Sequence, residues 1–186
     1  VMSKPLAVQY DVAVIGLGAM GLASVDACAA RGLKAIGLEQ FAPLHDLGSS
    51  HGRSRIIRRG YFEGAFYVPL LEQSYAMWND LETEAGRQFM TISGGLFAGP
   101  PTGEVVAETL AAANAYDVDV ELLESADCNR RFPQFKLPTD QVAVYEPGAG
   151  YINPDEVASF LMDRATAAGA DICHGIGAVR IEQQSG

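Results

Sequence analysis

Residues 10–39 carry a strand, a glycine turn, a helix and a second strand in close succession, and this order constrains the fold most. The run Val12–Ile15 is wholly apolar, which is typical of a strand inside a parallel sheet that is covered on both faces. Gly16 allows a tight turn, Gly18 lets the main chain approach a diphosphate, and Gly21 lets the helix pack close to the strand. The segment therefore predicts a dinucleotide site at the front of the chain.

The acidic residue that ends the second strand narrows the choice of dinucleotide. Glu39 falls about twenty residues beyond the glycines, where a carboxylate accepts hydrogen bonds from the adenosine ribose. The same carboxylate would repel the 2′-phosphate of NADP, so FAD or NAD is favoured. The start of the helix adds unpaired N–H groups and about half a positive charge, which suit the diphosphate. The alternative interpretation is a glycine-rich loop that binds no ligand.

The charge and hydropathy of the chain exclude several classes of partner. The 186 residues carry a formal net charge of -10, so the chain lacks the basic face that nucleic acid or an anionic membrane requires. No apolar stretch approaches the roughly 20 residues of a membrane span. Three widely spaced cysteines and three histidines form no metal-binding motif. We therefore expect a cytoplasmic protein without a metal site, folded as one domain or two small ones.

Hydrophobic periodicity predicts a mixture of helices and short strands in the rest of the chain. Helices are expected at residues 19–31, 68–86, 104–116, 125–131 and 153–169. Residues 55–59 are expected to form a short strand or an extended segment, and residues 90–97 carry short alternating runs typical of strands. Further strands are expected at residues 120–123, 141–146, 170–173 and 177–182. The pattern changes to short alternating runs from Phe89 onward, which distinguishes the middle of the chain from its dinucleotide-binding start.

A second chemical centre follows the nucleotide strand. Four arginines and a histidine fall within residues 51–59 of an otherwise acidic chain. Arginine recognises carboxylate and phosphate groups through two parallel N–H bonds. Because the cluster contains glycine and hydroxyl side chains and follows the nucleotide strand, we expect it to bind an anionic ligand. The alternative is a solvated basic loop that pairs with Glu82 and Glu84.

These motifs resemble those of the monomeric sarcosine oxidase and N-methyl-tryptophan oxidase family of FAD amine oxidases, within the D-amino-acid-oxidase-like superfamily. The matching segments are Gly16–Gly21, the Gly-Ser-Ser-His-Gly-Arg-Ser-Arg-Ile-Ile-Arg run at 48–58, Glu63–Gly64, Tyr67–Pro69 and Glu146–Pro154. The run at 48–58 is specific to this branch of the superfamily. The resemblance covers essentially the whole chain, but family enzymes are much longer, so the chain corresponds to their N-terminal half.

The resemblance implies an α/β (α+β) fold. A Rossmann-like FAD-binding domain would carry an inserted, partial substrate domain that contains an antiparallel sheet. We expect residues 1–86 and 147–186 to form the FAD-binding domain, discontinuous and incomplete, and residues 87–146 to form part of the substrate domain. The unpaired sheet edges of such a half would invite a homodimer.

The resemblance also implies a role for each residue of the two motifs. Gly16, Gly18, Gly21 and Glu39 would hold the ADP half of FAD, and Ser49, Ser50, His51 and Arg55 would lie near the flavin ring. His51 and Arg55 would take part in catalysis, Arg58 would bind the substrate carboxylate, and Tyr61 would line the substrate pocket.

The implied reaction removes a hydride from the N-methyl group or the adjacent C–H of a secondary amino acid such as sarcosine. The resulting imine hydrolyses, and oxygen is reduced to hydrogen peroxide. A cation such as Arg55 near the flavin would favour its anionic reduced form electrostatically. The expected partners are therefore a secondary amine or N-methyl amino acid, and oxygen.

The chain departs from the family's pattern at two positions. The family usually carries an acid at the position of Arg53 and a histidine at the position of Arg59, so the local charge is more positive here and the preferred amine can differ. The family's oxygen-activating lysine, second carboxylate contact and flavin-linking cysteine belong to its C-terminal half. Cys28, Cys128 and Cys173 match none of these groups.

We therefore expect these 186 residues alone to be inactive, whether they are a truncated piece, a gene fragment or one chain of a split enzyme. One alternative is a non-catalytic nucleotide-binding or oligomerising fragment of the same fold. Another is an NAD-dependent dehydrogenase, which fits the glycines but not the Ser-His-Gly run.

Overall fold

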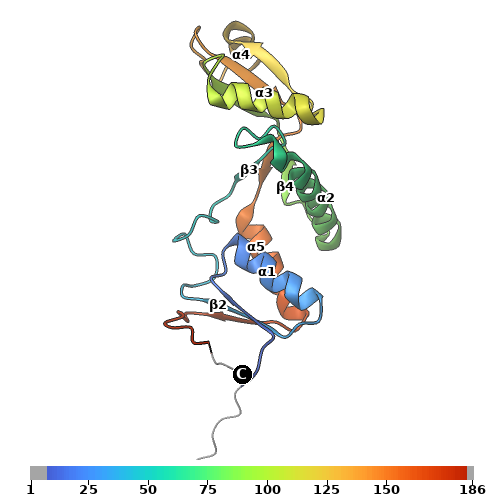
Figure 1. Cartoon of the computed structure of the whole chain (residues 1–186), viewed down its shortest axis with the longest axis vertical. Helices are drawn as coiled ribbons and strands as arrows, with labels where there is room; N and C mark the ends of the chain where they lie inside the picture. Colours follow the sequence, from blue (N-terminus) through green and yellow to red (C-terminus); the bar gives the residue numbers. More distant parts are fainter. Residues whose placement is uncertain (1–7, 184–186) are drawn as a thin grey trace, which may run out of the picture. The chain divides into compact units, whose positions relative to one another are not determined.

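The computed structural model describes residues 8–183, and the chain divides into two compact units. The first unit holds the residues up to Arg53 together with those from Asn153 onward, and the second unit holds Ser54–Ile152. Each unit has its own strands and helices, several of which are labelled in Figure 1.

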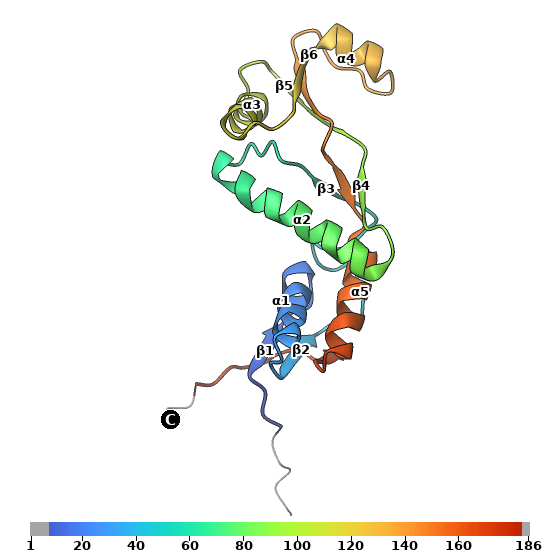
Figure 2. The ribbon, with the colours of Figure 1, turned by 90° about the vertical axis from the view of Figure 1, so that its right-hand side faces the viewer.

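The first unit contains a parallel three-stranded sheet in the order β1-β2-β9. Its elements are β1 (Val12–Ile15), α1 (Ala19–Ala30), β2 (Ala35–Glu39), α5 (Pro154–Ala167) and β9 (Asp171–His174). Figures 1 and 2 show α1 and α5 side by side against the sheet. The strand, glycine turn, helix and second strand expected at the front of the chain are thus present.

Close packing and one ion pair hold the two helices of the first unit in place. A Cβ on Gly37 of β2 would lie 2.7 Å from Leu17 Cδ2, so only glycine lets the Leu17 side chain lie this close over the strand. Arg164 of α5 donates from Nε and Nη2 to the two carboxylate oxygens of Asp26 of α1, at 2.8 and 2.5 Å. Asp26 is buried, and this two-pronged pairing is the geometry that makes a buried carboxylate tolerable.

The second unit is built on two antiparallel three-stranded sheets, in the orders β3-β8-β4 and β5-β7-β6. Its strands are β3 (Arg55–Ile57), β4 (Met90–Ile92), β5 (Gly95–Gly99), β6 (Glu121–Glu124), β7 (Val142–Glu146) and β8 (Gly150–Ile152). Its helices are η1 (Ala65–Tyr67), α2 (Val68–Ala85), α3 (Glu104–Tyr116) and α4 (Ser125–Arg131). The antiparallel sheet expected in the middle of the chain is therefore observed.

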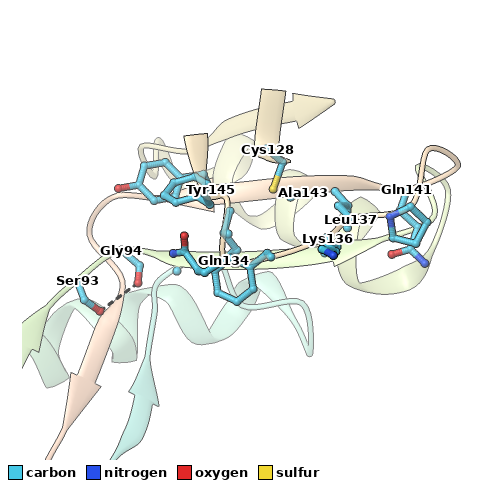
Figure 3. A pocket seen from close by; sticks show the side chains of 15 residues that line it. Ser93, Gly94, Cys128, Gln134, Lys136, Leu137, Gln141, Ala143 and Tyr145 are labelled. Carbon is cyan, nitrogen blue, oxygen red and sulfur yellow. Dashed lines mark hydrogen bonds between the residues drawn. The ribbon is translucent and has the colours of Figure 1, made fainter. Parts of the chain in front are cut away.

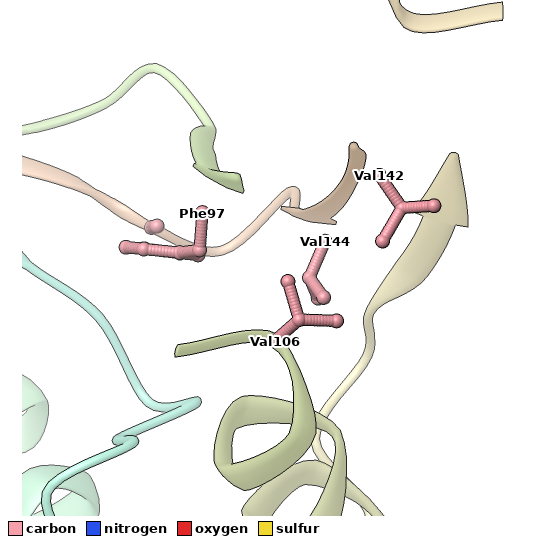
Figure 4. Close-up of a cluster of buried hydrophobic side chains, with 5 residues drawn as sticks. Phe97, Val106, Val142 and Val144 are labelled. Atoms are coloured by element: carbon pink, nitrogen blue, oxygen red, sulfur yellow. The ribbon is translucent and has the colours of Figure 1, made fainter. Parts of the chain in front are cut away.

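The two faces of the β5-β7-β6 sheet carry alternate residues of its central strand, β7. On one face Ala143 packs with Leu123 and Cys128, and Ala143, Cys128 and Tyr145 border a cavity (Figure 3). On the other face Val142 and Val144 pack with Phe97 and with Val106 of α3 (Figure 4). This alternation is the pattern of a strand that is buried on both sides.

Three expectations differ from the structure. Val12–Ile15 was expected inside a covered sheet, yet β1 is an edge strand of the described sheet, and Ile15 is 51% exposed. The strand expected at 90–97 is two strands, because the chain turns at Gly94, whose φ is +78°. Residues 177–182 form no strand, and Val179 is fully exposed, because they pair with no strand in the described part of the chain.

The compact units also differ from the expected domain boundaries. The expected division gave residues 54–86 and 147–152 to the FAD-binding domain, whereas the second compact unit contains them. The reason is strand pairing: Arg55 of β3 lies opposite Ile152 of β8, and β4 pairs with the same strand. The assignment of FAD binding and substrate binding to particular residue ranges stays a prediction.

No helix in residues 8–183 is long and apolar enough to cross a membrane. Within the same range, no three or more histidine, cysteine, aspartate and glutamate side chains gather where they could hold a metal ion.

Candidate functional site

The glycine turn of the first unit is as tight as the sequence predicts. Gly16 has a φ of +88°, a conformation that favours glycine. A Cβ on Gly21 would lie 1.9 Å from the main-chain oxygen of Gly16, which no real side chain can do. Gly21 is therefore required for α1 to begin this close to the end of β1.

The N-terminus of α1 is capped from the loop that follows β2. Gly18 is the N-cap residue and has no side chain to offer, so the main-chain N–H of Ala19 instead donates to Ser50 Oγ at 3.1 Å. A Cβ on Gly18 would lie 3.4 Å from the same Oγ. The structure thus brings Ser50 to the helix end where the sequence predicts a diphosphate. An acceptor oxygen already occupies the place that suits a phosphate oxygen.

Glu39 lies at the end of β2, buried beside the glycine turn. Its carboxylate accepts hydrogen bonds from the main-chain N–H of Leu17 at 2.8 Å and of Phe41 at 3.1 Å. His45 Nε2 lies 3.6 Å from the same carboxylate. Burial raises the pKa of Glu39, but the two hydrogen bonds and the charge of His45 outweigh it, so the net pKa is lowered. Glu39 is therefore ionised at neutral pH, next to the helix that would hold the diphosphate.

These three features fit a dinucleotide. Gly18 puts no side chain at the start of α1, where the main-chain N–H of Ala19 already points to an acceptor oxygen. The ionised Glu39 lies one strand away, where a ribose would offer its hydroxyl donors. The fit rests on local geometry within one unit, and the cofactor-binding roles expected of Gly16, Gly18, Gly21 and Glu39 stay predictions.

The loop that carries Ser49 and His51 is tied to the start of α5. His51 Nδ1 lies 2.5 Å from the main-chain oxygen of Gly48. Because a carbonyl oxygen only accepts, Nδ1 of His51 is the donor of this bond, and Nε2 is left for another partner. The N–H of Gly52 donates to Asp155 Oδ1 at 3.2 Å. The sequence analysis did not predict this contact between Asp155 and the loop.

Arg58 is the best-defined member of the arginine cluster, and it lies in the second unit. Its Nη2 donates to both carboxylate oxygens of Glu63, at 2.8 and 2.6 Å. Its guanidinium also lies 4.8 Å from the ring centre of Tyr61 and 4.5 Å from that of Phe62. Its Nε is buried without a hydrogen-bond partner in the described residues. The structure therefore leaves one guanidinium donor unused at a position predicted to bind a carboxylate.

Arg58 and Tyr61 border the same cavity, of about 340 Å³. The other residues around it are Ile56, Ile57, Glu63, Leu71, Ser74, Tyr75 and Trp78. The expected partners Arg58 and Tyr61 are thus brought together. Arg55 lies nearby in sequence on β3, exposed, with its Nη1 donating to the main-chain oxygen of Ser54 at 2.9 Å.

Two arginines of the cluster pair with acidic residues other than Glu82. Arg59 Nε donates to Glu72 Oε1 at 2.6 Å, and Arg58 pairs with Glu63. Glu82, a partner only under the alternative of a solvated basic loop, accepts hydrogen bonds from the main-chain N–H groups of Phe89 and Met90. Glu63 belongs to one of the matching motifs, and Glu72 lies on the predicted helix. The sequence does not predict that they pair with Arg58 and Arg59, because these pairs depend on the path of the loop.

The larger cavity of the second unit contains none of the expected site residues. It measures about 560 Å³ and is bordered on one side by Leu96, Ala143 and Tyr145 of the sheet. Gln134 and Lys136 border it from the segment after α4 (Figure 3). Its position therefore does not bear on the roles expected of the arginine cluster.

Comparison with known proteins connects both units to one family. Residues 11–186 match the family described as FAD dependent oxidoreductase. A monomeric sarcosine oxidase of Streptomyces avermitilis is 44% identical over 163 residues, which are 88% of this chain and 42% of that protein. An N-methyl-L-tryptophan oxidase of Yersinia pestis is 33% identical over 164 residues, or 88% of this chain and 44% of that protein. The chain thus spans less than half the length of these relatives.

A solved structure supports the same relationship. NikD, an unusual amino acid oxidase essential for nikkomycin biosynthesis, matches with a TM-score of 0.79 and 29% identity, over 89% of this chain and 43% of that one. L-proline dehydrogenase from P. horikoshii, with a TM-score of 0.73 and 20% identity over 90% of this chain and 44% of that one, shares the fold.

Proposed function

We propose that this chain, which belongs to the FAD dependent oxidoreductase family, supplies the dinucleotide site and the substrate arginine of an oxidase of secondary amines. Its two named relatives are a sarcosine oxidase and an N-methyl-L-tryptophan oxidase, which supports sarcosine or an N-methyl amino acid as the substrate. Because the chain spans less than half of either relative, the activity is proposed for a protein that contains this chain at full length.

One observation carries the cofactor proposal: an ionised, buried carboxylate lies next to the N-terminus of α1. Glu39 is held in place by the main-chain N–H groups of Leu17 and Phe41, and its charge excludes a 2′-phosphate. The start of α1 provides N–H donors for a diphosphate. FAD, when bound, would accept a hydride from the carbon next to the amine nitrogen and pass the electrons to oxygen.

His51 and Arg55 are proposed to act near the reacting centre. The Nδ1–H of His51 is committed to Gly48, which supports a role for Nε2 as an acceptor that orients or receives a proton. Arg55 carries a permanent positive charge and is exposed on β3. Such a cation stabilises negative charge that develops during the reaction.

Arg58 is proposed to bind the substrate's carboxylate. Its buried and unused Nε supports this role, because a carboxylate placed beside Nε would satisfy that donor. The aromatic rings of Tyr61 and Phe62 hold the guanidinium plane in one orientation. Glu63 then serves as the counter-charge of Arg58 when no substrate is present.

The test begins with FAD binding to this chain and to a Gly18→Val variant. The Gly18 site has room for a Cβ, so the variant should fold, but its side chain would occupy the approach of the diphosphate. We expect quenching of FAD fluorescence by the parent chain and none by the variant, with equal circular dichroism. Equal FAD binding by both proteins would contradict the proposed site.

The second arm of the test measures hydrogen peroxide from sarcosine and N-methyl-L-tryptophan. The full-length protein loaded with FAD should produce it steadily, and these 186 residues with added FAD should not. FAD binding without turnover in the full-length protein would favour the alternative of a non-catalytic nucleotide-binding protein. The homodimer and the cytoplasmic location stay predictions, which size-exclusion chromatography and cell fractionation test.

A further inference from the structure

A buried carboxylate in the second unit has no part in the function proposed so far. Glu146, the last residue of β7, is 1% exposed. Its Oε1 accepts a hydrogen bond from the main-chain N–H of Arg59 at 2.7 Å, and its Oε2 accepts one from that of Gly60 at 2.9 Å. Burial of a carboxylate is costly unless hydrogen bonds compensate it. The Glu146 carboxylate compensates its burial by binding the main-chain N–H groups of two successive loop residues.

The two amides bound by Glu146 lie in the segment that carries the proposed substrate-binding residues. Arg59 and Gly60 stand directly between Arg58 and Tyr61, the two residues proposed to meet the substrate. Glu146 itself is anchored, because it lies opposite Gly95 on the central strand of the β5-β7-β6 sheet. The carboxylate therefore connects a rigid strand to the main chain that carries the substrate arginine.

A second contact holds the same peptide from the direction of α3. A Cβ on Gly60 would lie 2.9 Å from Thr109 Cγ2 and 3.2 Å from Glu146 Oε2. Thr109 is fully buried, so its methyl group has little freedom to move away. Gly60 thus fits between the carboxylate and the methyl group with no space for a side chain.

The side chains of Arg58 and Arg59 contact different groups of residues. Arg59 turns to Glu72 and covers the ring of Tyr75, with its guanidinium carbon 3.6 Å from the ring centre. Arg58 enters the group of aromatic rings that includes Phe97, 5.2 Å from its guanidinium carbon. A shift of the Arg59–Gly60 peptide would therefore move the point from which the Arg58 side chain starts.

We propose that Glu146 is a positioning residue, whose carboxylate fixes the Arg59–Gly60 main chain and so directs the Arg58 guanidinium toward the substrate's carboxylate. The inference rests on the proposed function, since it deepens the role given to Arg58. It predicts that loss of one carboxylate oxygen weakens substrate binding more than it slows the chemical step.

The first test is Glu146→Gln in the full-length protein loaded with FAD, with sarcosine as substrate. Glutamine keeps the shape but replaces one acceptor oxygen with an NH₂ donor, so either Arg59 or Gly60 loses its acceptor. We expect the KM for sarcosine to rise about tenfold, which corresponds to the free energy of about one hydrogen bond to a charged group. The kcat and the FAD content should be nearly unchanged.

Glu82→Gln is the matched control. Glu82 Oε1 also accepts two main-chain hydrogen bonds, from Phe89 and Met90, each at 2.6 Å and within the same unit. It grips a segment that does not carry Arg58. Because one oxygen of Glu82 accepts both bonds, the amide oxygen of glutamine can keep them, so Glu82→Gln removes the carboxylate charge without removing a hydrogen bond. We therefore expect an unchanged KM for sarcosine in this variant. An equal rise of KM in both variants would show that loss of a carboxylate charge, and not the binding of the Arg59 and Gly60 amides, raises the KM.

The second readout is hydrogen exchange of the Arg59 and Gly60 amides, which does not require activity. We expect Glu146→Gln to speed their exchange and Glu82→Gln to leave it unchanged. Unchanged exchange in Glu146→Gln would contradict the claim that the Glu146 carboxylate holds these two amides. Faster exchange with an unchanged sarcosine KM in an active enzyme would overturn the positioning role while the proposed function stands. A wild-type protein that oxidises no carboxylated secondary amine would overturn both.

A variant that keeps the carboxylate covers the case in which Glu146→Gln does not fold. Gly60→Ala pushes the same peptide away from Thr109 Cγ2 and should raise the sarcosine KM. Adding Thr109→Ala removes that methyl group and should return the KM part of the way to the wild-type value. A KM that neither variant changes would contradict the proposal.

Discussion

The hydroxyl of Tyr75 on α2 donates a hydrogen bond to the main-chain oxygen of Gly148 at 3.0 Å. Gly148 lies between β7 and β8, so this bond ties α2 to the connection between the two sheets of the second unit. The guanidinium of Arg59 covers the ring of the same tyrosine.

Tyr75 should give the second unit a sensitivity to alkaline pH. Burial, and after it the charge of Glu146, raises the pKa of Tyr75 from 10.0 to about 12, although the charge of Arg59 opposes the rise. Because the folded pKa is raised, the stabilisation is complete below pH 10.0 and is lost as the pH rises through about 12. Tyr75→Phe should cost about 1 kcal/mol at neutral pH. It should also remove the last step of a tyrosinate absorbance titration; a step that persists would contradict the assignment.

Glu39 should make the first unit sensitive to acid. Its pKa is lowered in the folded chain from 4.5, so its stabilisation is present above pH 4.5 and is lost as the pH falls through the lower, folded value. Glu39→Gln should lower the free energy of unfolding by about 2 kcal/mol at neutral pH, because one hydrogen bond to a charged group is lost. Denaturant titrations across this pH range measure the effect. Glu108→Gln, on the exposed face of α3, is the control and should change little.

Gly21→Ala should unfold or strongly destabilise the first unit. The added methyl would lie 1.9 Å from the main-chain oxygen of Gly16, so α1 would have to move away from the end of β1. We expect a cost of about 3 kcal/mol. The matched control is Gly99→Ala, whose methyl would meet Val106 Cγ2 at an ordinary 3.7 Å. Similar melting temperatures for the two variants would refute this account of Gly21.

Arg58→Ala should separate substrate binding from cofactor binding. Removal of the guanidinium should raise the sarcosine KM of the full-length protein about 100-fold, because a charged, two-pronged partner of the carboxylate is lost. FAD content should not change. Arg58→Lys keeps the charge without the planar fork and should recover part of the loss. Arg130→Ala removes an exposed ion pair and serves as control. An unchanged KM in Arg58→Ala would remove Arg58 from the site.

The part of the site that sequence reasoning found is the part that depends on neighbours in the chain. The glycine turn depends on Gly16, Gly18 and Gly21, and each requirement follows from main-chain geometry over a few residues. The acidic end of the second strand follows from the length of one helix and two strands. Such local rules are readable without knowledge of the rest of the fold.

The part that sequence reasoning missed depends on contacts between distant residues. Glu146 meets Gly60 across 86 positions, and Asp155 meets Gly52 across 103. Hydrophobic periodicity does not predict such a contact, because the contact forms only after the strands have paired. The exposed edge of β1 has the same origin: composition shows that the strand is apolar, but not how many neighbours it has.

The route of the chain through the two units sets an order for folding during synthesis. The second unit is one continuous segment, Ser54–Ile152, whereas the first is divided into two pieces around it. Ile36 of β2 must wait for Asp171 of β9, its neighbour in the sheet. At about 5–20 residues per second, synthesis of the 135 residues from Ile36 to Asp171 lasts roughly 7–27 s. The middle of the protein is therefore complete and able to fold while the two segments that form the first unit are still apart.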